Sequence, residues 1–490
     1  MHQFIDGRRV EATTGNTRPV INPATGETIA QIDEAGAVEV DLAVAAARSA
    51  VREWSRATPG ERSAVLHRFA SALSDRAEEF AQLESAQAGK PIRLAREFDV
   101  PGTVDNAAFF AGAARNLEGK AAAEYSPVHT SMIRREAIGV VGSIAPWNYP
   151  LQMAAWKMLP AVAAGNAVVL KPAEITPLTS TLFAEVAHEA GVPAGVFNVV
   201  VGAGSVAGSA LMHHPDVNMV SFTGSTRVGR KVLEAAAGNA KRVHLELGGK
   251  APFVVFDDAD LEAAIHGAVA GSLINTGQDC TAATRAIVHR SVYNAFIDGV
   301  ATLYSKVRLG DTADPGTDLG PLVSMTHRDS VAGFVERANS YARIVVGGAA
   351  PGGDFARGSY YLPTLIADVT PDMEVFREEI FGPVLTVTQF DTDDEAFALA
   401  NDTVYGLAAS VWSKDVFRAM RGTREINAGC VWVNDHIPII SEMPHGGVKQ
   451  SGFGKDMSTY SFEEYTAVKH VMFDITGDAE KAWHRTIFTA

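Results

Sequence analysis

The stretch "NTGQDCTAA", residues 275 to 283, contains one of only two cysteines in a chain of 490 residues. A thiolate here could attack an electrophilic carbon and form a covalent intermediate. The glycine at 277 and the polar neighbours Gln278 and Thr281 are compatible with a reactive turn. The alternative is a buried, unreactive thiol, which is the usual state of a free cysteine. Composition alone favours the unreactive thiol for Cys280, so the choice depends on other residues.

The composition limits both the chemistry and the partners of the chain. Cys280 and Cys430 lie 150 residues apart and do not form the pattern of a disulfide framework, so we expect a reducing, cytoplasmic setting. The 57 acidic and 42 basic residues give a net charge of −15, which argues against nucleic acid or an anionic membrane as a partner. The 14 histidines include no H-E-x-x-H motif, and no cysteine pair has zinc spacing, so no metal is predicted.

Short apolar runs alternate with helical patterns through the middle of the chain. The runs are typical of strands buried on both faces, and they cover residues 166–171, 195–201, 217–223, 241–247 and 251–256. Strands joined by helices imply right-handed crossovers, so we expect an α/β fold with a parallel, doubly wound sheet. Alanine-rich helices are predicted within residues 35–90 and 97–118, and a second alternating region spans 280–445.

An uncharged segment of 18 residues, 139 to 156, resembles a membrane span in its composition. It contains Pro146, Asn148, Pro150 and Gln152, and lipid would leave the freed backbone and the amide groups without hydrogen-bond partners. A buried strand, a loop and the start of a helix are the better interpretation. The first residues of the chain also lack the apolar region of a signal peptide.

A doubly wound sheet commonly binds a nucleotide through a glycine-rich turn, and two turns are candidates. In "VVVGAGSVAG" the glycines at 202 and 204 and the alanine at 207 fit G-x-G-x-x-A, but the acid expected about 20 residues later to hold a ribose is missing. The other turn is "FTGSTRVG", residues 222 to 229. Its backbone N–H groups and hydroxyls, at the start of a predicted helix, could hold a pyrophosphate. The pattern alone does not choose between the two turns.

Six motifs, in this order, give the chain its resemblance to the aldehyde dehydrogenase superfamily. They are "PWNYP" (146–150), "KPAE" (171–174), "FTGSTRVG" (222–229), "LELGGK" (245–250), "GQDC" (277–280) and "EEIFGPV" (378–384). The resemblance implies an aldehyde dehydrogenase fold, with a Rossmann-variant parallel sheet, an α/β catalytic domain and a small β oligomerisation domain. The implied boundaries are 1–120 and 139–248 for the NAD-binding domain, 249–446 for the catalytic domain, and 121–138 with 466–480 for the oligomerisation element. We therefore expect a homo-oligomer, either a dimer or a tetramer.

The resemblance assigns the chemistry to three residues. Cys280 is the nucleophile, whose thiolate adds to an aldehyde to form a thiohemiacetal and, after loss of hydride, a thioester. The side-chain amide of Asn148 and the backbone N–H of Cys280 donate to the oxyanion. Glu246 is the general base that activates water for thioester hydrolysis. Two alternatives are a catalytically silent NAD-binding protein, which would be expected to have lost one of these residues, and a thioester hydrolase, which would leave the nucleotide motifs without a purpose.

The resemblance also implies an NAD site, with the pyrophosphate at the "FTGSTRVG" turn and the adenine ribose at Lys171 and Glu174. A carboxylate at 174 would repel a 2′-phosphate, which favours NAD over NADP. Leu247 would contact the nicotinamide amide, and Glu379 and Phe381 would hold and flank the nicotinamide ribose. The implied cofactor residues are Pro146, Trp147, Lys171, Pro172, Glu174, Gly204, Gly224, Ser225, Thr226, Gly229, Leu247, Glu379 and Phe381.

Three longer stretches resemble bacterial 4-aminobutyraldehyde dehydrogenases, a group related to the betaine-aldehyde enzymes. They are "FFAGAAR" (109–115), "HTSMIRREAIGVVGSIAPWNYPLQMAAWK" (129–157) and "SEMPHGGVKQSGFGKDMS" (441–458). A cationic substrate of this kind needs carboxylates and aromatic faces around it. The candidates are Asp105, Tyr149, Trp156, Asp279, Trp432, His436 and Glu442. The expected reaction converts 4-aminobutyraldehyde to 4-aminobutanoate in putrescine degradation, with betaine aldehyde or an aliphatic aldehyde as the alternative substrate.

Overall fold

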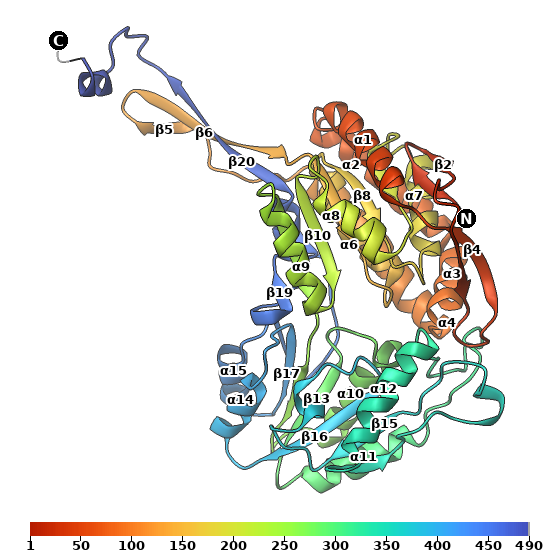
Figure 1. Cartoon of the computed structure of the whole chain (residues 1–490). Helices are drawn as coiled ribbons and strands as arrows, with labels where there is room; N and C mark the ends of the chain where they lie inside the picture. Colours follow the sequence, from red (N-terminus) through yellow and green to blue (C-terminus); the bar gives the residue numbers. More distant parts are fainter. Residues whose placement is uncertain (489–490) are drawn as a thin grey trace.

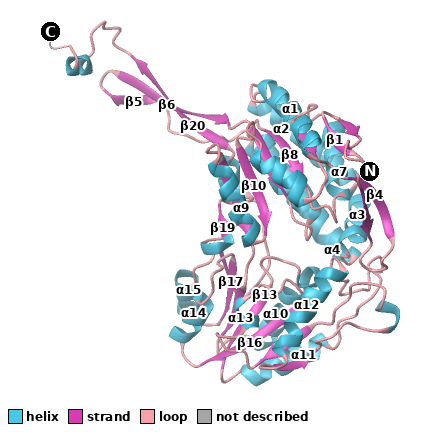
Figure 2. Ribbon diagram, in the orientation of Figure 1, coloured by secondary structure: helices cyan, strands magenta, loops and turns pink. Residues whose placement is uncertain are grey.

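Two large β-sheets are each surrounded by helices, and a slender β-arm projects away from them (Figure 1). This computed structural model describes residues 1–488. Helices and strands alternate along most of the chain, as Figure 2 shows by colour. The chain passes from the first sheet to the second at Gly248 and Gly249, between the strands β11 (Arg242–Leu247) and β12 (Ala251–Val255).

The first sheet has five parallel strands at its centre, in the order β11-β10-β7-β8-β9. The other four are β7 (Val140–Ile144), β8 (Ala167–Lys171), β9 (Phe197–Val199) and β10 (Met219–Gly224). Antiparallel strands extend both edges: β19 (Gly452–Phe453) lies beside β11, and β1 (Gln3–Ile5) and β2 (Arg8–Val10) lie beyond β9. Four of the predicted strands lie in this sheet, and their parallel arrangement is confirmed.

Both faces of the first sheet are buried, as continuous apolar runs predict. On β8, Val168 and Leu170 join one hydrophobic core, and Ala167 and Val169 join the other. This alternation follows from the period of two residues in a β-strand. The first core includes α2 (Pro59–Asp75), α3 (Ala77–Ala88), α4 (Ile92–Leu94), α5 (Val100–Ala113), α6 (Pro150–Ala163), α7 (Leu178–Glu189) and α16 (Ser458–Glu464). The second core includes α1 (Ala37–Trp54), α8 (Ser209–His213) and α9 (Thr226–Ala237).

The second sheet begins with the fifth predicted strand, β12, and has the order β14-β15-β16-β13-β12-β17-β18. Its other strands are β13 (Ala283–His289), β14 (Arg343–Val346), β15 (Thr364–Ala367), β16 (Val384–Phe390), β17 (Ala408–Trp412) and β18 (Cys430–Val433). The strand β14 is antiparallel to β15, and the other pairs are parallel. The helices of this region are α10 (Leu261–Leu273), α11 (Tyr293–Tyr304), α12 (Met325–Ala338), α13 (Glu374–Arg377), α14 (Asp393–Asn401) and α15 (Val416–Glu425).

The arm is a three-stranded antiparallel sheet that carries the C-terminal segment away from the two large sheets (Figure 1). It consists of the hairpin β5 (Ala123–Ser126) and β6 (His129–Ala137), together with β20 (Thr466–Asp474). The strands β6 and β20 pair along their whole length, from Ala137 with Thr466 to His129 with Asp474. A separate hairpin, β3 (Thr17–Ile21) with β4 (Thr28–Asp33), lies near the N-terminus.

The uncharged segment 139–156 forms β7, a loop and the first part of α6, as predicted. Proline occupies the first position of α6, where its missing N–H breaks no helical hydrogen bond. Every residue of α6 is buried, so the apolar character of the segment comes from the core of the protein. Across residues 1–488, no helix combines the length and the apolarity that crossing a membrane requires.

Candidate active site

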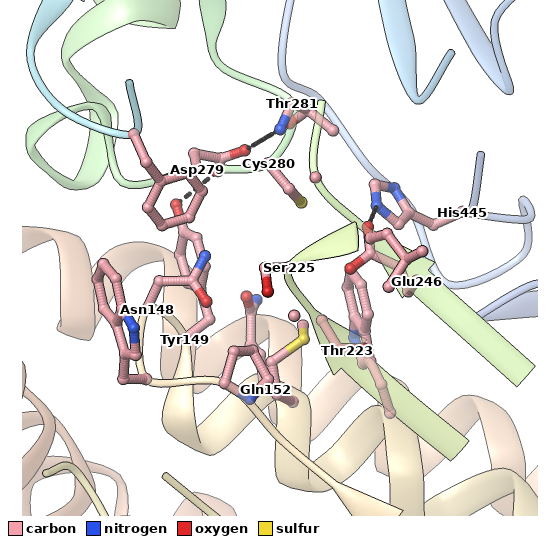
Figure 3. Close-up of a pocket in the computed structure, with 18 of the residues that line it drawn as sticks. Asn148, Tyr149, Gln152, Thr223, Ser225, Glu246, Asp279, Cys280, Thr281 and His445 are labelled. Carbon is pink, nitrogen blue, oxygen red and sulfur yellow. Dashed lines mark hydrogen bonds and ion pairs between the residues drawn. The ribbon is translucent and has the colours of Figure 1, made fainter. Parts of the chain in front are cut away.

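A cavity of about 270 Å³ lies at the carboxyl ends of β7, β10 and β11, where loops of the second sheet close over the first (Figure 3). From β7 the chain adds β8 and β9 on one side of the sheet and then β10 and β11 on the other, so the strand order reverses between β7 and β10. Open α/β sheets bind their ligands at such a reversal. The lining residues are Phe98, Pro146, Trp147, Asn148, Tyr149, Gln152, Met153, Trp156, Thr223, Gly224, Ser225, Glu246, Leu247, Gly248, Asp279, Cys280, Thr281, His327, Glu379, Phe381, Ile437, Ile439 and His445.

Cys280 follows a strained turn that precedes β13. Asn275, Thr276 and Gly277 all have positive φ, at 50°, 58° and 70°. Threonine rarely adopts this conformation, because its branched Cβ crowds the backbone. A Cβ at Gly277 would lie 2.2 Å from the carbonyl oxygen of Gly382, so only glycine fits at this position. Local strain of this kind is common where a reactive side chain is held in a fixed place.

Within the cavity, the Cys280 thiol lies nearest to a carboxylate and an imidazole, those of Glu246 and His445. Its Sγ, a carboxylate oxygen of Glu246 and a ring nitrogen of His445 all lie within 4.8 Å of one another. Burial raises the pKa of the Cys280 thiol well above its ordinary value, and the negative charges of Glu246 and Asp279 add to this effect. The thiol is therefore protonated at neutral pH in the ligand-free protein, and a base is needed to generate the nucleophile.

The raised pKa predicts how Cys280 should react with iodoacetamide. Because only the thiolate reacts, the rate of alkylation should rise about tenfold per pH unit and should not level off below about pH 9. The Cys430→Ala variant is a suitable background, since it removes the other free thiol. The rate is measured by mass spectrometry of the alkylated protein. A plateau near neutral pH would show that the thiolate is already stable there.

Asn148 is buried in the same cavity and is fixed next to the Cys280 turn. Its Nδ2 donates to the carbonyl of Gln278 at 3.0 Å, and Asn275 Nδ2 donates to the Asn148 carbonyl at 2.8 Å. An amide nitrogen carries two hydrogens, so one N–H of Asn148 remains for a second acceptor. The geometry therefore suits an amide that donates to an oxyanion formed on the substrate.

Glu246 lies on β11, opposite Thr223 on β10, and its side chain enters the cavity next to His445. The distance between His445 Nε2 and Glu246 Oε1 is 3.6 Å, and both side chains are buried. His445 was not among the residues selected from the sequence. It reaches the cavity because its backbone pairs with that of Asp456 in both directions, at 2.8 Å and 2.7 Å. The other lining residues without a role predicted from the sequence are Phe98, Gln152, Met153, Thr223, Gly248, Thr281, His327, Ile437 and Ile439.

The N-terminus of α9 has the features of a phosphate site. Ser225 is the N-cap residue, and its side chain does not cap the helix. The first backbone N–H groups of α9 are therefore left for an external anion. A Cβ at Gly229 would lie 2.8 Å from Leu247 Cδ2, so glycine allows α9 to pack closely against β11. The hydroxyl of Thr226 donates to the carbonyl of Gln450 at 3.1 Å.

Lys171 and Glu174 form an ion pair at the end of β8, with 2.7 Å between Nζ and Oε2. Burial acts to raise the pKa of the Glu174 carboxyl, but the charge and the hydrogen bond of Lys171 lower it overall. Glu174 is therefore a carboxylate that can accept hydrogen bonds from ribose hydroxyls. Gly204 lies near this pair, because a Cβ there would be 3.9 Å from Lys171 Nζ. Pro172 lies in the loop between the two charged residues.

A third group of candidate cofactor residues forms one wall of the cavity. Glu379 Oε1 accepts from a backbone N–H, that of Gly249, at 2.9 Å, and burial raises its pKa to about 7. Phe381 packs edge-on against Trp147, with the ring centroids 5.3 Å apart. Leu247, Pro146 and Gly224 lie at the same cavity. A carboxyl group and flat apolar faces suit the nicotinamide end of a dinucleotide.

Three of the predicted substrate residues line the cavity, and hydrogen bonds fix all three. Asp279 Oδ2 accepts from the Tyr149 hydroxyl at 2.7 Å. Asp279 Oδ1 accepts from the N–H and the hydroxyl of Thr281, at 2.7 Å and 2.6 Å. Trp156 Nε1 donates to Asn106 Oδ1 at 2.8 Å, which holds the indole in the wall. A carboxylate and two aromatic rings therefore lie in the same cavity as the thiol. Figure 3 shows Asp279 and Tyr149 beside Cys280.

The other predicted substrate residues, Asp105, Trp432, His436 and Glu442, do not line this cavity, and a contact with the substrate stays a prediction for them. Asp105 is exposed on α5 and accepts from the Ser441 hydroxyl at 2.5 Å, so it anchors the C-terminal loop. Trp432 Nε1 donates to the carbonyl of Pro438 at 2.9 Å, which holds the loop containing Ile437 and Ile439. Glu442 is exposed.

His436 is buried behind the nucleophile turn. Its Nε2 lies 2.8 Å from the carbonyl oxygen of Thr281, and its Nδ1 lies 2.9 Å from the hydroxyl of Ser410. Burial lowers the pKa of His436 to about 4, so the ring is uncharged at neutral pH. Its ring supports the loop that follows Cys280.

Comparison with known proteins identifies the class of protein. Residues 10–471 match the model of the aldehyde dehydrogenase family, so the chain belongs to that family. A Burkholderia cenocepacia protein assigned as an aldehyde dehydrogenase is 43% identical, with a TM-score of 0.97 over 98% of this chain and 99% of that chain. The two relatives below have structures determined with bound cofactor.

Betaine aldehyde dehydrogenase from Staphylococcus aureus, in complex with NAD⁺, is 38% identical. Its TM-score is 0.96 over 98% of this chain and 96% of that chain. PnpE from Pseudomonas sp. WBC-3, in complex with nicotinamide adenine dinucleotide, is 41% identical, with a TM-score of 0.96 over 97% of this chain and 98% of that chain. The predicted aldehyde dehydrogenase fold is therefore confirmed.

Proposed function

We propose that this protein oxidises a small aldehyde to a carboxylate, with NAD as its cofactor. The observation that carries the proposal is the meeting of Cys280, Glu246 and Asn148, from three distant segments of the chain, in one cavity. Relatives that are 38% and 41% identical have been crystallised with NAD. The open N-terminus of α9, the Lys171–Glu174 pair and the carboxyl of Glu379 provide groups that fit the pyrophosphate and the two riboses.

In the proposed reaction, Cys280 loses its proton to a base and its Sγ adds to the carbonyl carbon of the aldehyde. The free N–H of the Asn148 amide and the backbone N–H of Cys280 donate to the oxyanion of the thiohemiacetal. NAD supplies, when bound, the acceptor for the hydride. The thioester that remains on Cys280 is hydrolysed by water, whose proton passes to Glu246. Glu174 favours NAD over NADP, because its carboxylate would repel a 2′-phosphate.

We propose 4-aminobutyraldehyde as the substrate and 4-aminobutanoate as the product, which places the enzyme in putrescine degradation. Asp279 immediately precedes the nucleophile and lines the same cavity. A primary ammonium a few bonds from the aldehyde carbon could donate to this carboxylate while Cys280 attacks the carbonyl. The rings of Tyr149 and Trp156 add faces that attract a cation.

The substrate proposal is tested by measuring kcat/KM from NADH formation with 4-aminobutyraldehyde, betaine aldehyde and hexanal. We expect 4-aminobutyraldehyde to have the highest value. Lack of turnover with every aldehyde would rule out the dehydrogenase, and equal values for hexanal and 4-aminobutyraldehyde would rule out the ammonium site.

Substitution of Asp279 by asparagine should separate the charge from the shape of this site. We expect Asp279→Asn to lower kcat/KM for 4-aminobutyraldehyde by about 10-fold to 100-fold, the value of a hydrogen bond to a charged group, and to change the value for hexanal little. Asp105→Asn is the matched control, since that acid lies outside the cavity. An equal loss with both aldehydes would mean that Asp279 only supports the nucleophile turn.

Betaine aldehyde is the second candidate substrate. The similarity to a betaine aldehyde dehydrogenase and the aromatic lining of the cavity favour it. A quaternary ammonium has no N–H to donate and is bound mainly by aromatic faces. A higher kcat/KM with betaine aldehyde, together with little effect of Asp279→Asn, would favour this substrate over 4-aminobutyraldehyde.

We also propose that the arm mediates homo-oligomerisation, into a dimer or a tetramer. The strand β20 exposes Val468, Met472 and Phe473, and the adjacent hairpin exposes Tyr125 and Val128. Apolar side chains exposed together in this way are typical of a surface that another subunit covers.

We also propose a cytoplasmic location for the protein. Its two cysteines are both free thiols, which fits a reducing compartment.

A further inference from the structure

Cys280, Glu246 and His445 form a compact group of three potential metal ligands (Figure 3). Glu246 Oε1 and His445 Nε2 are both buried, and neither has a hydrogen-bond partner. They face each other at 3.6 Å, a distance too long for a hydrogen bond. Buried polar atoms are normally hydrogen-bonded, so two buried ligand atoms without a protein partner, next to a thiol, are available to a further ligand.

We propose that this group binds one Zn²⁺ ion and that the bound ion blocks the nucleophile and the base at the same time. Thiolate, imidazole and carboxylate are the ligands that zinc prefers. Bonds of about 2.0–2.1 Å at a tetrahedral angle put the nitrogen and oxygen ligands about 3.4 Å apart. The separation of 3.6 Å between His445 Nε2 and Glu246 Oε1 is close to this value. The Cys280 sulfur, which lies within 4.8 Å of both atoms, completes the set.

The charge of the group also suits a divalent cation. A thiolate at Cys280 and a carboxylate at Glu246 carry two negative charges, and a neutral imidazole at His445 carries none. Zn²⁺ therefore gives a neutral complex, which costs less to bury than an unpaired charge. Binding breaks the S–H bond of Cys280 and forms the Zn–S bond, and the proton leaves to solvent without any change in oxidation state. Mg²⁺ and Ca²⁺ prefer oxygen ligands and are disfavoured.

The surrounding structure holds two of the three ligands in place before an ion binds. The backbone of His445 is clamped by two hydrogen bonds to Asp456, whose buried carboxylate pairs with Lys157 at 3.0 Å. Glu246 lies on β11 between its neighbours on β10 and β19, where it is in register with Gly452. Fixed ligand orientation raises metal affinity, because little freedom is lost on binding.

The cavity gives an ion a route to these ligands and leaves the fourth position of a tetrahedral site open. Water or an anion would occupy this position, as in zinc sites with three protein ligands. If the proposed function holds, the ion occupies the place where the aldehyde carbonyl must approach Cys280. Zinc should then compete with the aldehyde rather than with NAD, and a chelator should restore activity.

The site is tested by titrating the Cys430→Ala protein with Co²⁺, a spectroscopic substitute for Zn²⁺, and then displacing it with Zn²⁺. We expect one equivalent of Co²⁺ to give a thiolate-to-cobalt charge-transfer band that Zn²⁺ removes. Cys280→Ala should abolish the band. His445→Phe and Glu246→Gln should each weaken Zn²⁺ binding by roughly 100-fold, since even groups that only orient a ligand change affinity by 10-fold to 100-fold. His213→Ala, which changes an exposed histidine, is the control.

Two results would overturn the zinc site. The first is a charge-transfer band that persists in Cys280→Ala, and the second is an unchanged zinc affinity in both His445→Phe and Glu246→Gln, with folding checked by circular dichroism. The two variants change different segments of the chain, so if one of them fails to fold, the other still tests the site. Because the band does not depend on turnover, the zinc site and the aldehyde reaction can fail separately. Inhibition by Zn²⁺ that is not competitive with aldehyde would overturn the blocking role.

Discussion

Cys280→Ala is expected to lower aldehyde oxidation by at least about 10⁴-fold, as loss of a covalent nucleophile does in other enzymes. Without the sulfur no thiohemiacetal can form, so no carbon is prepared to release a hydride. The affinity for NAD should change little, because the proposed pyrophosphate and ribose contacts lie on α9, β8 and the loop after α13. The rate is measured as NADH formation, and NAD binding as quenching of tryptophan fluorescence, since Trp147 lines the cavity.

Cys430→Ala is the matched control for this substitution. Cys430 begins β18 and does not line the cavity, so its removal should leave oxidation close to that of the unchanged protein. If Cys280→Ala lost NAD binding or folding together with activity, the thiol would have a structural role. The strained turn before Cys280 does not depend on the sulfur, because the positive φ angles belong to residues 275–277. Alanine should therefore keep the local backbone.

The sheets could be predicted from the sequence because each local signal agrees with the tertiary structure. The run "NAVVLK" is apolar at every strand position before the lysine, and β8 is buried on both faces as that pattern requires. The prolines in the segment 139–156 excluded a membrane span and marked the start of α6. The oligomerisation role of the arm stays a prediction, since its exposed apolar residues show only that a surface is uncovered.

The candidate site was less predictable, because its residues meet only through the fold. Cys280 and Glu246 are 34 positions apart; Glu246 lies on β11 of the first sheet, whereas Cys280 lies in the turn before β13 of the second. Resemblance to a family selected both, whereas spacing and composition did not. His445 was missed because a backbone bridge to Asp456 brings it to the cavity, and no local pattern encodes that bridge.

Asp105 and His436 were selected for their chemical type and for their place near motifs, and the structure uses both to anchor loops. The carboxylate of Asp105 holds Ser441, and the ring of His436 holds the backbone of Thr281. Polar side chains have such local roles more often than they contact a ligand, because most side-chain hydrogen bonds are made to the backbone or to water. Chemical type alone therefore does not decide which polar residues contact a ligand.

Glu246→Gln should separate formation of the thioester from its hydrolysis. Glutamine has the shape of glutamate but cannot take a proton from water, so hydrolysis should slow by about 10²-fold to 10⁴-fold. The first turnover should still produce NADH, which gives a burst equal to the active-site concentration followed by a slow steady rate. Stopped-flow absorbance measures both phases, and mass spectrometry detects the acyl group on Cys280.

Two additions make the Glu246→Gln experiment decisive. Hydroxylamine attacks a thioester without the help of a general base, so it should raise the steady rate of the variant much more than that of the unchanged protein. Glu378→Gln is the control, because Glu378 is an exposed glutamate that lies outside the cavity. A slow burst would mean that Glu246 also takes the proton of Cys280, whose raised pKa makes a base necessary at neutral pH. An unchanged steady rate would exclude Glu246 as the base. His445, whose Nε2 lies 3.6 Å from the same carboxylate, would then be the next candidate for the base.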